Sequence, residues 1–428
     1  MAQDCERALP TGRGLLAHLA CLLGPLMVLA CSSDRARPDA APASADANSP
    51  QGEEVMGIPP NLDARVGSGG GAPCDASEQC LLGACTLGVC SEWMHAMRIA
   101  IDTTSAGAAV GESVMLFPLL IRLDALNFDF GEARPDGSDI RFLDSSDNAL
   151  AYQIERWDSE EALAEIWVLI PRVLGNSRDN VVLVYWGNQL ATQASSGPSV
   201  FGNFSSVFHM DEDPNDSAVQ IEDDSGHNNP GTVQSQSGAD PRGEGIAGSG
   251  LALNGDTVMS TMHNLPPPLP VTISLWLKTT SVAGGGIAGF ASRPTGDNVT
   301  YDRFVAMDSG GHLSFAVRRG GAMAPLTSLT SYNDDRWHFI AARFSRAGQY
   351  LFVDGESVAD DSTLTSADAY PGFWRFGEEP TPAGTSYYIS GSMDEARIST
   401  DELSAAWIKL SYATQRPGAN AVIYSARL

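Results

Sequence analysis

The sequence is 428 residues long and strongly acidic, with 52 Asp and Glu against 26 Lys and Arg and a formal net charge of −26. That length holds two ordinary domains and additional tail. The charge argues against nucleic acid as a partner and against electrostatic docking on anionic lipid, because both need clustered basic side chains. An acidic surface suits a soluble exported protein; it could also hold a cation, although solubility alone explains it.

Residues 1–30 are expected to be an export signal. The apolar run from Leu15 to Leu29 is shorter than a confident membrane span and ends in Val28-Leu29-Ala30-Cys31. This ending resembles a bacterial lipobox. The resemblance implies lipidation of Cys31 and a location at the outer membrane or cell surface, with the membrane contacted through the lipid anchor alone. The alternative is an ordinary cleaved signal of a secreted protein, in which Cys31 is an incidental thiol.

Residues 31–73 are rich in Ala, Pro, Asp, Ser and Gly and are predicted to be a disordered linker, because they lack the apolar surface that offsets ordering entropy. Residues 74–91 form a small cysteine module. Four cysteines in so short a run indicate either two disulfides or one zinc ion. Export and the absence of a Cys-x2-Cys knuckle favour disulfides, with three pairings open. The four cysteines are Cys74, Cys80, Cys85 and Cys90.

Residues 92–202 are predicted to form a first β-sandwich. Strand-like runs separated by turns cover 97–101, 115–123, 140–142, 151–156, 166–171 and 181–186. The motifs Asp136-Gly137-Ser138-Asp139 and Tyr185-Trp186-Gly187-Asn188, with Trp157 and Trp167 between them, resemble a bacterial domain of unknown function (number 2341). The resemblance implies an extracellular sandwich without known chemistry. Its tryptophans are expected to fill the core rather than to form a ligand platform.

Residues 203–428 are predicted to form a second all-β domain, organised around the hairpin from Trp337 to Gly355. The first strand of this hairpin is apolar on both faces, which indicates that both faces are covered. Trp276 upstream and Met393-Asp394-Glu395 downstream complete a pattern that resembles the laminin-G-like, concanavalin A-like jelly roll. A helix capped by Thr400 and a last strand over 421–425 are expected at the end of the chain.

One acidic loop predicts a structural calcium site. Hard cations bind several carboxylate and carbonyl oxygens, and no stretch has EF-hand spacing, so the donors would come from separate segments. The first and last strands of such jelly rolls lie side by side, which would bring the acidic loop near Asp394. The alternative is a solvated loop with Asp394 bonded to nearby backbone. The candidate donors are Asp211, Asp213, Asp216 and Asp394.

Aromatic and polar residues of the jelly roll predict a ligand site, because sugars bind on aromatic faces flanked by amide and charged partners. The aromatic candidates, expected to be exposed, are Tyr301, Tyr332, Trp374 and Tyr387, with Arg303 and Asn333 as hydrogen-bond partners. Trp374 shares a strand face with Phe376, and the alternative is that this face belongs to the core. For each of these candidates alone a structural role is favoured, and only as a set do they indicate a carbohydrate or protein ligand. No motif of a catalytic nucleophile, a metalloprotease or a retaining glycosidase is found, so no catalytic residue is predicted.

The sequence therefore predicts an exported, lipid-anchored, non-enzymatic protein that binds a glycan or an extracellular protein partner. Two alternatives remain: a structural component of the envelope or of an assembly, and a glycan-cleaving enzyme with a carboxylate pair that sequence patterns miss.

Overall fold

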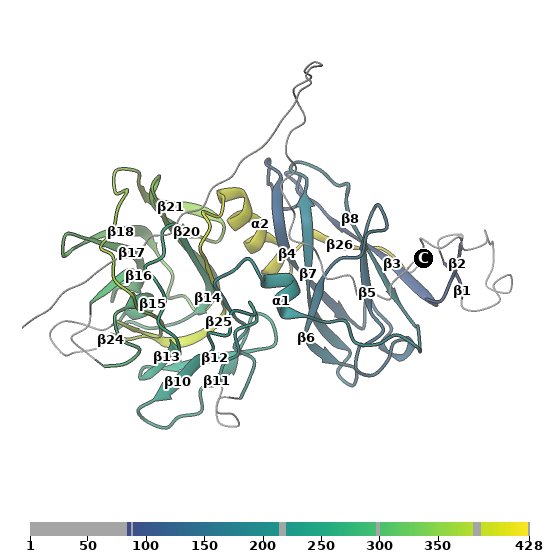
Figure 1. The fold of residues 1–428 in the computed structure, drawn as a ribbon, viewed down its shortest axis with the longest axis horizontal. Helices are drawn as coiled ribbons and strands as arrows, with labels where there is room; N and C mark the ends of the chain where they lie inside the picture. The colour runs from purple at the N-terminus through teal and green to yellow at the C-terminus, as the bar shows by residue number, and fades with distance from the viewer. Residues whose placement is uncertain (1–83, 87–88, 214–219, 297–299, 380–386, 427–428) are drawn as a thin grey trace, which may run out of the picture. The chain divides into compact units, whose positions relative to one another are not determined.

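The computed structural model describes residues 84–86, 89–213, 220–296, 300–379 and 387–426, which form a nearly all-β structure (Figure 1). In the short antiparallel pair β1 (Ala84–Thr86) and β2 (Val89–Ser91), Cys85 lies opposite Cys90. The predictions at Cys31, Cys74 and Cys80 lie outside the described residues. No helix within these ranges is long and apolar enough to cross a membrane.

The first sandwich consists of two antiparallel sheets with the orders β26-β3-β8-β5 and β4-β7-β6. Their strands are β3 (His95–Ile101), β4 (Val114–Asp124), β5 (Arg141–Asp144), β6 (Tyr152–Asp158), β7 (Leu163–Val173), β8 (Asn180–Trp186) and β26 (Val422–Tyr424). Period-two alternation points Phe117, Leu119 and Ile121 of β4 inward, and each is fully buried. The six strands predicted for residues 92–202 are all present. The short helix η2 (Phe130–Glu132) lies between β4 and β5, and α1 (Gly197–Phe201) follows β8 and leads to the second sandwich.

The second sandwich is the predicted jelly roll. Its larger sheet follows the path β10-β13-β22-β15-β16-β17-β18, with β23 and β24 beside β15. Its smaller sheet follows the path β11-β12-β25-β14-β19-β20-β21, with β9 beside β25. The strands of the larger sheet are β10 (Gly231–Ser235), β13 (Thr257–Thr261), β15 (Gly285–Ala291), β16 (Tyr301–Met307), β17 (His312–Arg319), β18 (Ala322–Ser331), β22 (Phe373–Phe376), β23 (Glu378–Glu379) and β24 (Tyr387–Tyr388). Those of the smaller sheet are β9 (Ser206–Phe208), β11 (Arg242–Glu244), β12 (Ser249–Asn254), β14 (Val271–Lys278), β19 (Trp337–Ser345), β20 (Gly348–Val353), β21 (Glu356–Asp361) and β25 (Ser390–Ser399).

The hairpin of β19 and β20 is apolar on both faces because each face packs in a different core. Ile340 and Phe344 point into the core between the jelly-roll sheets. Phe339 belongs instead to the apolar cluster of the first sandwich, where its ring centroid lies 5.3 Å from that of the buried Trp276. The expectation that this strand is covered on both faces is confirmed.

Helix α2 (Ala405–Gln415) covers the outer face of the smaller sheet, where Nε1 of Trp276 donates to Oε1 of Gln415 at 2.8 Å. The helix begins later than predicted. Its N-cap is Ser404 rather than Thr400, because the hydroxyl of Ser404 accepts a hydrogen bond from the backbone N–H of Trp407. The Trp407 ring also packs edge-on against Phe117 of β4, so the helix contacts both sandwiches.

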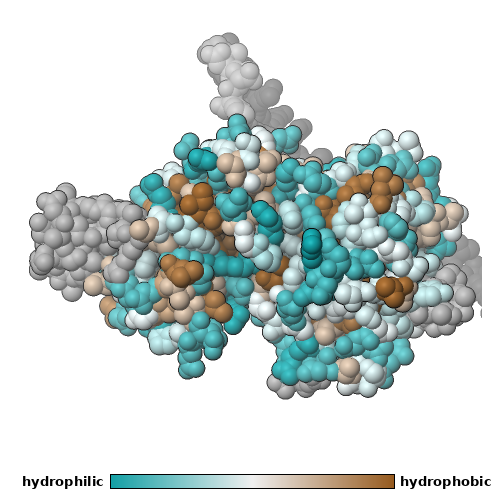
Figure 2. Space-filling model, turned by 180° about the vertical axis from the view of Figure 1, so that it is seen from behind, coloured by the Kyte–Doolittle hydropathy of each residue, from teal (hydrophilic) through white to brown (hydrophobic). Residues whose placement is uncertain are grey.

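The last strand, β26, lies within the range predicted for it but completes the first sandwich rather than the jelly roll. It pairs antiparallel with β3 at the edge of the four-stranded sheet, and the two strands lie next to each other in Figure 1. The jelly roll was expected to span residues 203–428, but residues 422–424 belong to the first sandwich. The chain thus returns to the first sandwich, where β26 pairs with the edge of β3 that would otherwise be open to other chains. On the face seen in Figure 2, apolar side chains form small separate patches in a largely polar surface.

Candidate functional site

A β-bulge in β25 places three charged side chains on the outer face of the smaller sheet. Met393 and Ala396 both point into the jelly-roll core although they are three positions apart. The pairing of β25 with β14 shifts register at this point, and Glu395 has a positive φ of 54°. Because a bulge inserts one extra residue, Asp394, Glu395 and Arg397 can all lie on the side away from that core.

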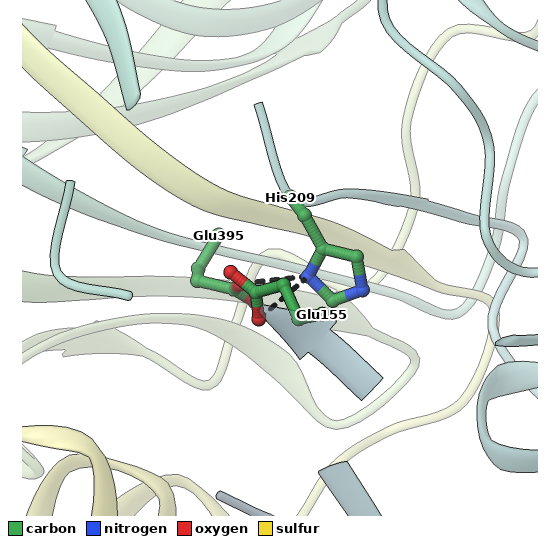
Figure 3. Close-up of side chains that lie close together, drawn as sticks. All are labelled: Glu155, His209 and Glu395. Atoms are coloured by element: carbon green, nitrogen blue, oxygen red, sulfur yellow. Dashed lines mark hydrogen bonds and ion pairs between the residues drawn. The ribbon is translucent and has the colours of Figure 1, made fainter. Parts of the chain in front are cut away.

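His209 places one ring nitrogen between two carboxylates (Figure 3). It follows β9, which pairs with β25 as predicted for the first and last jelly-roll strands. Its Nδ1 lies 2.7 Å from Oε1 of Glu395 and 3.6 Å from Oε2 of Glu155. Glu155 comes from β6, so this charge cluster joins the two sandwiches. The three side chains are at most 2% exposed.

Arg397 and Trp167 complete the charge cluster. The guanidinium of Arg397 donates to Oε2 of Glu395 at 2.5 Å and lies 4.1 Å from the ring centroid of Trp167. The indole N–H of Trp167 donates in turn to Oε2 of Glu155 at 2.5 Å. Two carboxylates thus face one guanidinium and one imidazole. Paired in this way, buried charges avoid the large desolvation cost that isolated ones would carry.

The proximity of these groups shifts their pKa values in opposite directions. Burial lowers the pKa of His209, but the negative charges of Glu395 and Glu155 outweigh it and raise the pKa to about 10. Burial would raise the pKa of Glu395, yet His209 and Arg397 hold it below its usual range. Burial, and then the charge of Glu395, raises the pKa of Glu155 well above its ordinary value. The same two causes raise the pKa of Asp394.

The charge cluster also has the residue types of a metal site. One ligand atom each from Glu155, His209 and Glu395 lies within 4.8 Å of the others. Among the described residues, Oε1 of Glu155 has no hydrogen-bond partner. However, the close Nδ1–Oε1 hydrogen bond and the ion pair to Arg397 already engage His209 and Glu395. The arrangement is therefore that of a protonated ion-pair network.

The predicted calcium donors are only partly brought together. Asp394 uses both carboxylate oxygens to accept backbone N–H groups, including those of Ile246 and Ala247, which matches the alternative considered for it. Asp213 pairs with Arg242 at 3.1 Å. Asp211 lies beside the same 246–248 turn that Asp394 binds, and Asp216 lies outside the described residues. Calcium binding stays a prediction.

Two of the predicted ligand residues are buried: the core alternative holds for Trp374, and the prediction of Arg303 as a hydrogen-bond partner for a surface ligand is wrong. Trp374 is completely buried in the jelly-roll core, because it and Phe376 share the inward face of β22. Arg303 is 2% exposed, forms an ion pair with Asp302 and donates to the backbone carbonyl of Pro268. Neither side chain can contact a ligand on the surface in this structure.

Of the other four candidates, Tyr332 and Asn333 lie apart from Tyr301 and Tyr387. Tyr301 begins β16 and is half-buried, whereas Tyr387 in β24 is 54% exposed. Tyr332 bonds through its backbone to the turn that follows β16, and its ring packs against His338. Asn333 donates to the carbonyl of Ser281. Tyr301 and Tyr332 thus lie near opposite ends of one strand.

The first sandwich contains a pocket of about 520 Å³ that the sequence did not predict. Its walls come from the loop after β4, from η2, from the turn between β6 and β7, and from β3 and β8. The only local signal is the alternation Phe128-Asp129-Phe130, which sets two buried rings around an exposed carboxylate. The lining residues are Met97, Ala125, Leu126, Asn127, Phe128, Asp129, Phe130, Gly131, Glu132, Ser159, Ala162 and Trp186.

Two family models match the chain, in the order expected from the sequence. Residues 136–217 match a domain of unknown function, DUF2341. Residues 253–409 match the concanavalin A-like lectin/glucanases superfamily. The chain therefore carries a DUF2341 region followed by a concanavalin A-like jelly roll. Among curated proteins, none matches the sequence.

Several solved structures resemble the chain at low identity. A native heptameric SAP-like pentraxin from Limulus polyphemus has 13% identity and a TM-score of 0.31, over 41% of this chain and 92% of that one. Domain 4 of the GH43 extracellular arabinanase AbnA from Geobacillus stearothermophilus, in complex with arabinotriose, has 15% identity and a TM-score of 0.33, over 48% and 97%. The sialidase CBM40 of Ruminococcus gnavus, bound to α2,3-sialyllactose, has 18% identity and a TM-score of 0.30, over 33% and 82%. At such scores the likeness identifies no ligand for this chain.

Proposed function

We propose that this protein is a non-enzymatic binding protein of the cell surface that recognises carbohydrate through its jelly roll. The match of residues 253–409 to a superfamily that includes lectins supports this proposal at the level of fold. A fold alone does not specify function, so the proposal depends on the side chains presented on the surface.

The supporting observation is a group of two tyrosines and a carboxylate on the larger sheet. Burial raises the pKa of Tyr301, and the negative charge of Glu379 raises it further. Tyr387 lies directly opposite Glu379 in the β23–β24 ladder and is 54% exposed. An aromatic face beside a carboxylate provides both the apolar contact and the hydrogen-bond acceptor that a sugar ring uses.

A binding role is preferred to glycan cleavage because of where the close carboxylates lie. A glycosidase needs two carboxyl groups flanking an accessible bond, about 5 Å apart in retaining enzymes. Glu155 and Glu395 are near enough, but both are fully buried and neither can reach a polysaccharide. The lipid anchor predicted at Cys31 and the linker after it would hold the sandwiches near the membrane and raise their local concentration.

A glycan array probed with the full chain, with and without calcium, tests the proposal. We expect binding to at least one glycan class, and weaker binding after Tyr301→Ala or Tyr387→Ala. Leu329→Ala, at a 95% exposed position elsewhere on the larger sheet, serves as the control and should bind normally. An array without any signal in either condition would favour a structural role in the envelope, and release of reducing ends from polysaccharides would favour an enzyme.

A further inference from the structure

The pocket of the first sandwich has an apolar base. Phe128, Phe130 and Trp186 line it, and each of the three side chains is at most 7% exposed. The ring centroid of Phe128 lies 5.0 Å from that of Phe130 and 4.8 Å from that of Trp186. Because Nε1 of Trp186 is itself buried, these rings offer a ligand hydrocarbon contact and no hydrogen-bond donor.

The segments above this base carry negative charge. Two segments of the pocket wall, 124–132 and 158–162, together contain six acidic residues and no basic one. None of the lining residues in the described part of the chain is Lys, Arg or His. Like charges around a concave site add their potentials, so the pocket attracts cations and repels anions.

Two of these carboxylates belong to the lining itself. Asp129 is exposed, and its Oδ1 accepts only the backbone N–H of Gly131, which leaves acceptor positions for a ligand. Glu132 turns Oε2 inward, 3.6 Å from Nδ1 of His95, and its side chain is 26% exposed. Asp129 therefore provides the carboxylate that a ligand can contact, and Glu132 adds negative charge beside it.

The combination of charge and hydrocarbon selects the chemical class of ligand. An anion would be repelled by the carboxylates, and a neutral molecule would gain no charge interaction with them. A metal ion would make no use of the apolar base. A primary ammonium group donates up to three hydrogen bonds to carboxylates, and an alkyl chain attached to it can be buried against the rings.

We propose that this pocket binds a primary alkylammonium group, with the nitrogen donating to Asp129 and the alkyl chain packed against Phe128 and its neighbouring rings. The volume of about 520 Å³ lies within the range of roughly 300–1,000 Å³ that is usual for small-molecule sites. A free diamine and the lysine side chain of a polypeptide share this chemistry. The site belongs to the first sandwich and does not depend on the jelly-roll surface proposed above.

Calorimetry and saturation-transfer NMR on the full chain test the site with three probes of equal length: pentylammonium, pentan-1-ol and pentanoate. We expect pentylammonium to bind in the millimolar range, about five- to tenfold more tightly than the alcohol, and pentanoate to bind most weakly. Raising NaCl from about 50 to about 500 mM should weaken the binding of pentylammonium and leave that of the alcohol unchanged. Cadaverine and Nα-acetyl-lysine methylamide distinguish a free diamine from a lysine side chain.

A conservative variant separates charge from shape. Asp129→Asn keeps an oxygen that can accept the N–H of Gly131, and it should weaken pentylammonium binding about two- to fivefold without affecting the alcohol. Glu112→Gln removes an exposed carboxylate near the opposite end of β4 and is the matched control, which should leave binding unchanged.

A second pair of variants tests the position of the site. Ala125→Trp fills the mouth of the pocket from an exposed position and should abolish binding of pentylammonium. Leu174→Trp, just beyond the far end of β7 from the 158–162 segment, should leave binding unchanged, as should Tyr301→Ala on the jelly roll. Alcohol or pentanoate binding as tight as that of pentylammonium, undiminished binding in Asp129→Asn or Ala125→Trp, or no binding at tens of millimolar would each overturn the proposal.

Discussion

The stability of the protein should decrease as the pH rises above neutrality, because His209 is protonated in the folded state. Its pKa is about 10 in the fold, against an ordinary value of 6.5. A raised pKa contributes its full stabilisation below 6.5, and that contribution is lost as the pH rises towards 10. Glu395, Glu155 and Asp224 supply the negative charges that face the ring, and Arg397 is the neighbouring cation.

The size of the effect follows from the proton count. Between the two pKa values the folded state holds one more proton than the unfolded chain, so the free energy of unfolding falls by about 1.4 kcal/mol per pH unit. From pH 7 to pH 9 we expect a loss of about 2–3 kcal/mol. Since His209 is 2% exposed, solvent screens this little. The raised pKa values of Glu155 and Asp394 also make stability fall with rising pH, beginning above their ordinary values of 4.5 and 3.8.

Urea unfolding followed by tryptophan fluorescence, from pH 6.5 to 9.5, measures this slope. His209→Gln should lower stability at pH 7 by about 3–5 kcal/mol, because it leaves buried carboxylates uncompensated, and its stability should vary less with pH. His209→Gln combined with Glu155→Gln should recover part of the loss. His227→Gln, at an exposed histidine, is the control and should keep the wild-type slope. Equal slopes in the wild type and in His209→Gln would refute this account of the charge cluster.

Three further outcomes are expected. Deleting 421–428 should lower the melting temperature in scanning calorimetry and promote aggregation in size-exclusion chromatography, since β3 loses its edge partner; an unchanged protein would contradict the pairing. Gly137→Ala should cost more stability than Gly238→Ala in urea titrations, because both have a positive φ but only the first would meet Trp157 at 2.5 Å. If the predicted calcium site is real, chelation should lower the melting temperature, whereas identical melting curves would count against it.

The sequence predicted those features that local patterns encode. The face assignment of Ile340, Ala342 and Phe344 is confirmed because strand periodicity and turn residues are local signals. The partner of the last strand was not predictable in this way. Residues 422–424 are merely apolar and short, and nothing in them indicates that the receiving edge is β3, more than three hundred positions earlier.

The burial of Trp374 shows a different limit. In Phe373-Trp374-Arg375-Phe376, alternation tells which residues share a face of β22 but not which face is covered. The structure shows that Trp374 and Phe376 point inward, while Arg375 pairs with Glu378. An aromatic side chain on a strand therefore indicates a binding site only when its exposure is known.

The charge cluster escaped prediction because two irregular features create it. The bulge at Glu395 breaks the alternation that would otherwise turn this side chain into the jelly-roll core. His209, which meets Glu395, is 186 positions away, so no motif spacing connects them. The second carboxyl group beside His209, that of Glu155, belongs to the other sandwich, so the charge cluster is complete only when the sandwiches are docked. Undocking would leave His209 and Glu395 paired but would remove Glu155 and the ring of Trp167 that covers Arg397. Docking and the protonation of His209 are therefore linked, and conditions that remove that proton should also weaken the association of the two sandwiches.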